Sequence, residues 1–144
     1  MSREMHFGLA IALVVVGATP TRADPARTSA PADAVVYIIA PAHGEVVHSP
    51  VTVKFGLRGM GVAPAGVDVP GTGHHHLLID VPKLPALDRP IPSDAHHRHF
   101  GAGQTETTLD LPSGEHRLRL LLGDRNHVPH DPPVISREIT IRVD

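Results

Sequence analysis

The chain of 144 residues contains no cysteine, no tryptophan and a single tyrosine. Without cysteine, no disulfide can stabilise the fold and no thiolate can bind a metal ion. Aromatic residues make up only 3% of the sequence and no basic run is present, so we expect no nucleic-acid partner. Any metal ion must therefore be held by imidazole, carboxylate, thioether or water.

Long apolar runs are also scarce. Residues 7–18 (FGLAIALVVVGA) form an apolar run that is too short to span a bilayer comfortably. A charged start precedes this run, and small residues with a proline follow it up to Ala23, which is typical of a secretory signal peptide. We therefore predict a signal peptide at residues 1–23, a periplasmic or secreted protein, and no membrane span after cleavage.

The remaining sequence is rich in the turn-forming residues glycine and proline and has few helical patterns. The whole chain contains 13 glycines and 15 prolines. Residues 24–34 are small and polar, which predicts a disordered leader. Residues 35–144 contain short β-rich segments separated by glycine and proline, which predicts one domain. The fold class that we expect is all-β: a single antiparallel immunoglobulin-like β-sandwich of about seven strands.

Hydrophobic alternation gives the expected strands. The segments with β-branched or alternating apolar residues are Val35–Ala40, Val51–Arg58, His74–Val81, Glu106–Leu111, Glu115–Leu122 and Val134–Val143. Pro112-Ser113-Gly114 separates two of them, Glu106–Leu111 and Glu115–Leu122, and predicts that these two form a hairpin. In the second of the two, Leu118, Leu120 and Leu122 share one face, which we expect to lie in the core.

Histidine is abundant where other reactive residues are absent. Twelve histidines occur, and most of them fall in three clusters, at 74–76, 96–99 and 127–130. Histidine is the commonest metal ligand, and two of its side chains at i and i+2 of a strand lie on one face, roughly 6–7 Å apart. We expect the three clusters to meet in space. The predicted metal ligands are His74, His76, His97, His99, His127 and His130.

Other interpretations of these residues stay open. His75 and His116 share strand faces with apolar residues, which favours structural roles. The clusters could also form a hydrogen-bonded polar network that orders two long loops, or a surface with only adventitious metal affinity. Met60 is either a soft ligand or a core residue. Asp124 and Asp131 are either partners that orient the histidines or caps of turns.

Three stretches carry a family resemblance: GTGHHHLLID at 71–80, HFGAGQTE at 99–106 and LLGDRNHVPHDPP at 121–133. They resemble the signature of a secreted bacterial domain family of unknown function, over about residues 35–143. The resemblance implies an exported, small domain and no activity. The general plan is also similar to that of periplasmic copper-handling domains, which is an analogy of fold and not of function.

The function that these observations favour is that of a periplasmic histidine-rich β-sandwich binding protein. It would hold a transition-metal ion, copper in preference to zinc, for storage or delivery and without catalysis. One alternative is a metal-free interaction module that binds an envelope protein or glycan. The other is a small copper or zinc metalloenzyme. No serine lies in a nucleophile elbow, and Gly101-Ala102-Gly103 does not precede a helix, which argues against hydrolytic and nucleotide-binding sites.

Overall fold

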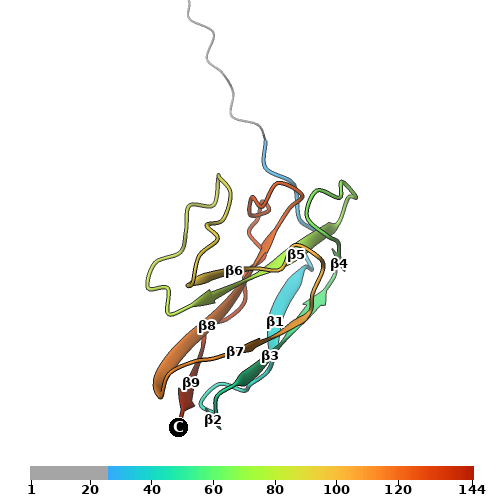
Figure 1. The fold of residues 1–144 in the computed structure, drawn as a ribbon. Helices are drawn as coiled ribbons and strands as arrows, with labels where there is room; N and C mark the ends of the chain where they lie inside the picture. The colour runs from blue at the N-terminus through green and yellow to red at the C-terminus, as the bar shows by residue number, and fades with distance from the viewer. Residues whose placement is uncertain (1–25) are drawn as a thin grey trace, which may run out of the picture.

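The computed structural model describes residues 26–144, and the predicted signal peptide lies outside them (Figure 1). None of the described residues forms a helix of the length and apolarity that a membrane span requires. The strands in this part of the chain are β1 (Val35–Ala40), β2 (Val46–Val47), β3 (Val51–Arg58), β4 (Gly61–Val62), β5 (Thr72–Ile79), β6 (His97–His99), β7 (Glu106–Leu109), β8 (Gly114–Gly123) and β9 (Ile139–Val143).

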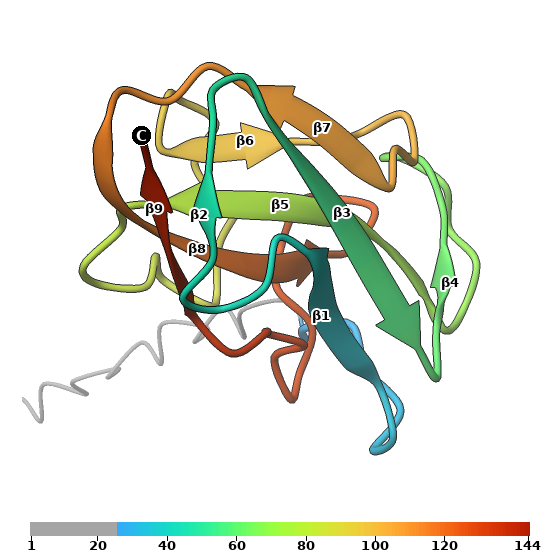
Figure 2. The ribbon, with the colours of Figure 1, turned by 90° about the horizontal axis from the view of Figure 1, so that it is seen from below.

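The strands form two sheets that pack face to face. One sheet has the order β1-β3-β7, and the other has the order β2-β9-β8-β5-β4, with β6 paired to β5. Figure 2 shows β1 and β3 crossing over β5 and β8. The predicted all-β, sandwich-like fold is confirmed. It is not purely antiparallel, because β2 pairs with β9 and β4 pairs with β5 in parallel.

The core lies between the two sheets and follows the predicted alternation. Val51, Val53 and Phe55 of β3 are buried on one side of it. Leu118, Leu120 and Leu122 of β8 are each 0% exposed and contribute the other side, which confirms the predicted core face. On β5, Leu77 and Ile79 point into this core.

A second, smaller apolar cluster covers the outer face of the larger sheet. It consists of Leu78, Leu121 and Ile91, with Ile91 contributed by the long segment between β5 and β6. Because side chains alternate along a strand, His74 and His76 lie on the same outer face of β5 as Leu78. The fold therefore places His74 and His76 on an outer sheet face that loops cover.

The predicted hairpin between β7 and β8 is wrong. β7 pairs with β3, whereas β8 pairs with β5 and β9, so consecutive strands belong to different sheets. Leu109 of β7 and Leu118 of β8 are both buried in the core between the sheets. The short linker crosses from one sheet to the other because the two apolar strand faces pack against each other, which neighbours in one sheet cannot do.

Residues 28–30, within the predicted leader, form backbone hydrogen bonds with a distant loop. The backbone N–H of Asp131 donates to the carbonyl of Thr28 (2.9 Å), and that of Ala30 donates to the carbonyl of Asp131 (3.2 Å). Ala30 is buried. This stretch is small and polar, yet it is held because a distant loop satisfies its backbone groups.

Candidate metal centre

Three segments far apart in the sequence bring four histidines together: His74, His76, His99 and His127. His74 and His76 come from one face of β5. His99 comes from β6, where the strand register places it directly opposite His76. His127 comes from the loop after β8, and β8 pairs with β5 so that Gly123 lies opposite His74.

The four rings form a compact group. One nitrogen from each ring lies within 4.8 Å of the nitrogens chosen from the other three. The ring centroids of His74 and His76 are 4.8 Å apart, and those of His99 and His127 are 4.7 Å apart. Bonds of about 2 Å to one ion keep ligand nitrogens within roughly 4 Å of one another, so small side-chain movements would complete a four-coordinate site.

The group is buried on one side and open on the other. His74 and His76 are 0% and 1% exposed, whereas His99 is exposed and His127 is half-buried. The strand ligands are therefore fixed by packing, and the other two face the solvent. A metal ion could reach the group from the side of His99 and His127.

Two glycines leave the space that the rings occupy. A Cβ at Gly123 would lie 2.7 Å from Cε1 of His76, and a Cβ at Gly101 would lie 2.3 Å from Cε1 of His99. Both distances are shorter than van der Waals contact, so a larger residue would displace the ring. These glycines were not among the residues selected from the sequence. Their only sequence signal is their place within the two histidine-containing motifs.

Each of the two buried rings, His74 and His76, has one nitrogen without a hydrogen-bond partner among the described residues. Within residues 26–144, no partner is found for Nδ1 of His74 or Nδ1 of His76, while Nε2 of His74 lies 3.2 Å from Nδ1 of His127. An unsatisfied buried nitrogen costs about 1–3 kcal/mol, so the two unpaired atoms need an explanation. Both ring nitrogens of His75 and Nδ1 of His130 also lack partners in the part of the chain that the structure describes, so this feature is not confined to the four-histidine group. Within the group, Nε2 of His74 faces His127, and a neutral imidazole nitrogen with a free lone pair can bind a metal ion.

The surroundings lower the pKa of three of the rings, those of His74, His76 and His99. Burial lowers the pKa of His74 to about 4, and the neighbouring His99 and His127 add to the effect. Burial lowers the pKa of His76 to about 3, again with help from the other imidazoles. The pKa of His99 is also lowered, by burial and by His127. Neutral imidazole is the form that binds metal, so these residues are ready to act as ligands at neutral pH.

His127 lies at the tip of a tight loop that Asp124 organises. Its φ is +66°, which is uncommon for a residue other than glycine, and its backbone N–H donates to the carbonyl of Asp124 at 2.9 Å. The Asp124 carboxylate accepts hydrogen bonds from the backbone of Asn126 and Val128. Of the two roles considered for this aspartate, turn capping is the one observed, and the turn is the one that presents His127.

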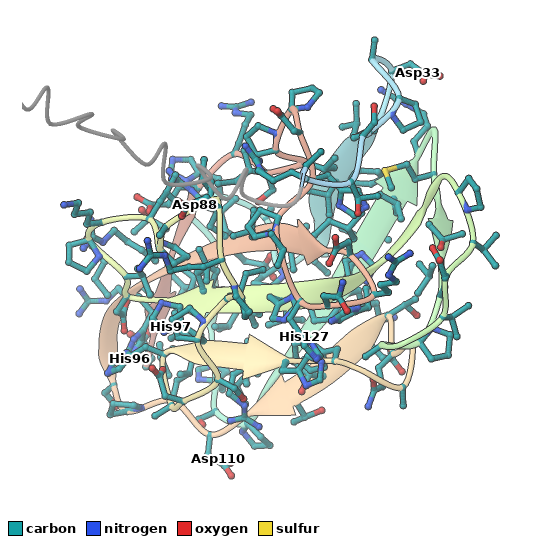
Figure 3. The ribbon with its side chains drawn as sticks, turned by 90° about the horizontal axis from the view of Figure 1, so that it is seen from above. Asp33, Asp88, His96, His97, Asp110 and His127 are labelled. Carbon is teal, nitrogen blue, oxygen red and sulfur yellow. The ribbon has the colours of Figure 1, made fainter. Side chains whose placement is uncertain are left out.

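Two of the six predicted ligands lie outside the four-histidine group. Nδ1–H of His97 donates to Oδ1 of Asp94 at 2.9 Å, and Figure 3 shows His97 well separated from His127. Nε2–H of His130 donates to the carbonyl of Thr72 at 3.2 Å, and the ring is fully buried. The structure therefore brings four of the predicted residues together and gives the other two different neighbours.

The remaining candidates have structural surroundings, as the alternation along the strands favours. The ring of His75 packs against Phe55, with centroids 5.2 Å apart, on the core side of β5. His116 hydrogen-bonds the carboxylate of Asp80 at 2.7 Å. Met60 packs against the main core. Asp131 pairs with Arg27, with 3.5 Å between the charged atoms, and is not a partner of the metal-site rings.

Comparison with known proteins gives one match. Residues 53–144 match the family described as domain of unknown function (DUF4399). No curated protein and no solved structure matches the chain. The matched segment begins within β3 and includes all four histidines of the group. By this match, the chain belongs to the DUF4399 family.

Proposed function

We propose that this protein is a periplasmic metal-binding protein that holds one transition-metal ion at the group formed by His74, His76, His99 and His127. The observation that carries the proposal is the convergence of four imidazoles from three separate segments within 4.8 Å. Two of these rings are buried with a nitrogen that has no hydrogen-bond partner in the described part of the chain. Both nitrogens of His75 and Nδ1 of His130 share this property, so the convergence of the four rings, and not the unpaired atoms, supports the proposal.

The donor set favours copper over zinc. Four neutral imidazoles suit both ions, but at equal availability the affinity of such a site for Cu²⁺ exceeds that for Zn²⁺. No thiolate is present to select Cu⁺, because the chain contains no cysteine. We therefore propose Cu²⁺ as the preferred ion and Zn²⁺ as its competitor.

The half-open geometry favours storage or delivery over permanent retention. A structural metal site is usually closed and completely surrounded by protein. Here His99 is exposed and His127 is half-buried, so water and competing ligands can approach the ion from that side. An ion in this position can be exchanged without unfolding the domain.

The test is a metal titration of the untagged protein with matched variants. We expect wild-type protein to bind one equivalent of Cu²⁺ at pH 7.5, measured by elemental analysis after dialysis and by isothermal titration calorimetry. His99→Ala should weaken binding by more than the roughly 10–100-fold that the loss of an outer hydrogen-bond partner costs. His97→Ala is the matched control, because both histidines belong to β6 and are two residues apart.

The outcomes separate the alternatives. If wild-type protein binds no stoichiometric copper or zinc at micromolar concentration, the metal-binding proposal fails and a metal-free interaction module becomes the better explanation. If the two variants lose affinity equally, the site is not the four-histidine group. In that case the HxH pair of β6 binds as a unit instead.

A further inference from the structure

We propose that residues 27–30 form a strap that positions His127 and slows the release of the metal ion. The inference rests on the proposed function, because it concerns the same site. It adds residues outside the metal-binding group, above all Thr28, and a segment for which the sequence predicts disorder.

A single carboxylate organises the loop that carries His127. Oδ1 of Asp124 accepts the backbone N–H of Asn126 at 2.8 Å and that of Val128 at 3.0 Å. These two residues flank His127 on either side. The position of the imidazole therefore depends on the orientation of the Asp124 side chain, which is only 5% exposed.

The strap holds the other oxygen of the same carboxylate. The hydroxyl of Thr28 donates to Oδ2 of Asp124 at 2.6 Å. A buried carboxylate needs hydrogen bonds at both oxygens, and a bond to a charged acceptor is about twice as strong as one between neutral groups. Thr28 thus completes the set of hydrogen bonds that fixes Asp124, although Thr28 itself is exposed and distant in sequence.

A second set of contacts clamps the far end of the loop. Nε–H of Arg27 donates to the carbonyl of Pro129 at 3.1 Å, and a second nitrogen of the guanidinium donates to the carbonyl of His130. The guanidinium also lies 3.5 Å from the carboxylate of Asp131. The strap therefore holds both ends of the segment 124–131, and His127 lies between them.

The backbone conformation of His127 depends on the contacts that hold its loop. A residue other than glycine with φ near +66° persists only where the surrounding structure holds it in place. When Thr28 releases Asp124, the loop can relax and His127 can move away from the other three ligands. The three remaining imidazoles then hold the ion less tightly, and release becomes faster.

The test replaces the hydroxyl of Thr28 and follows Cu²⁺ in the protein without its predicted signal peptide. Thr28→Val keeps the shape of the side chain and removes the donor, whereas Thr28→Ser restores it. Thr108→Val is the matched control, because Thr108 is also exposed and its hydroxyl lies 3.4 Å from that of Thr52 within the three-stranded sheet, away from the four histidines. The rate of Cu²⁺ transfer to excess EDTA is measured by stopped flow, and the copper environment by electron paramagnetic resonance.

We expect Thr28→Val to release Cu²⁺ faster, with an altered copper spectrum. The increase should be no more than about 10-fold, the lower end of the loss for a direct partner of a metal ligand, because Thr28 acts through Asp124. Thr28→Ser and Thr108→Val should behave like wild type. Wild-type binding with unchanged release and spectrum in Thr28→Val would overturn the strap but leave the proposed function intact. Absence of binding in the wild type would overturn both. Urea unfolding of the metal-free variants shows whether a faster release merely reflects a loss of global stability, which would also count against the strap.

Discussion

His116 and the pair His74 and His76 lie on neighbouring strands of one sheet and have opposite surroundings. His116 on β8 has an acceptor at each ring nitrogen: the carboxylate of Asp80 at 2.7 Å and the carbonyl of Pro112 at 2.8 Å. His74 and His76 on β5 face other imidazoles, and Nδ1 of each has no partner among residues 26–144. The same residue type is therefore held by acceptors in one place and left with free lone pairs in the other.

The pKa of His116 is raised and that of His74 is lowered, because hydrogen-bond acceptors offset the effect of burial at His116, whereas burial and other imidazoles act together at His74. Burial would lower the pKa of His116, but the hydrogen bonds to Asp80 and Pro112 raise it above its ordinary value. A neutral imidazole has one N–H and cannot serve two acceptors, so this site favours the imidazolium. Burial and neighbouring rings lower the pKa of His74 to about 4. The surroundings, rather than the residue type, distinguish an ion-pair histidine from a candidate ligand.

The largest expected effect is a stabilisation by metal that only one of the two groups supports. At Cu²⁺ concentrations of 100–1,000 times the dissociation constant, binding to the folded state should add about 2.7–4.1 kcal/mol at pH 7.5. Thermal unfolding with and without Cu²⁺ measures the gain. The paired substitution of His74 and His76 by alanine should remove it, whereas His116→Ala should retain it. An equal gain in both variants would contradict the comparison.

A smaller effect should follow when space beside the ligands is filled. In Gly123→Ala, the new Cβ would lie 2.7 Å from Cε1 of His76 and 3.3 Å from Cα of His127. We expect a loss of about 1–3 kcal/mol in the free energy of unfolding, together with weaker Cu²⁺ binding, because overpacking forces these neighbours apart. Gly61→Ala is the control, since its Cβ would meet only Cγ2 of Thr72 at 3.5 Å. Equal urea midpoints for the two variants would show that the ring of His76 has room to move.

The pH dependence of the metal-free protein gives the next test. His74 and His76 have folded pKa values below 6.5, so the unfolded chain binds more protons between about pH 4 and 6.5. Protonation of these histidines therefore does not reduce the free energy of unfolding above about pH 6.5, and the free energy of unfolding falls as the pH drops towards 4. The slope reaches about 1.4 kcal/mol per pH unit for each histidine. Urea unfolding at pH 7 and pH 5 should show a smaller loss in His76→Gln than in wild type.

The smallest effect concerns His116 and has the opposite sign. Its folded pKa is raised, so its stabilisation is complete below about pH 6.5 and is lost as the pH rises through the folded value. Asp80→Asn should cost about 1–2 kcal/mol at pH 6 and less at pH 8.5, measured by urea unfolding. Asparagine tolerates the φ of +56° at this position. Asp88→Asn, in an exposed pair with Arg89, should leave stability unchanged at both pH values.

Strand periodicity predicts much of this molecule. The alternation along β5 separates His74 and His76 from His75, and the leucines of β8 identify the core. Sequence spacing alone does not show which of His97 and His99 joins the four-histidine group, because the two residues form one HxH pair. Pairing with β5 places His99 opposite His76, and the carboxylate of Asp94 takes His97 as its partner. Such choices depend on contacts between distant segments, which local patterns do not contain.

The same limit applies to the predicted hairpin and to the segment at residues 27–30. A proline-serine-glycine linker is compatible with a hairpin, but the choice of sheet for β7 and β8 depends on which apolar faces pack together. Residues 27–30 have the composition of a disordered segment, and their order comes from hydrogen bonds to the loop at 124–131. Composition predicts whether a segment is ordered on its own. Here the segment contacts a loop about a hundred residues away, as between Arg27 and Pro129.

The placement of β7 and β8 in different sheets also has a kinetic consequence. Local hairpins fold quickly, whereas a sandwich whose consecutive strands separate must close long chain loops before its contacts form. The hydrogen-bonded pair of His74 and His127 is 53 residues apart in sequence. The four imidazoles can converge only after β5, β6 and β8 are in register. Capture of a metal ion during refolding would therefore be a late event, and its time course would report completion of the larger sheet.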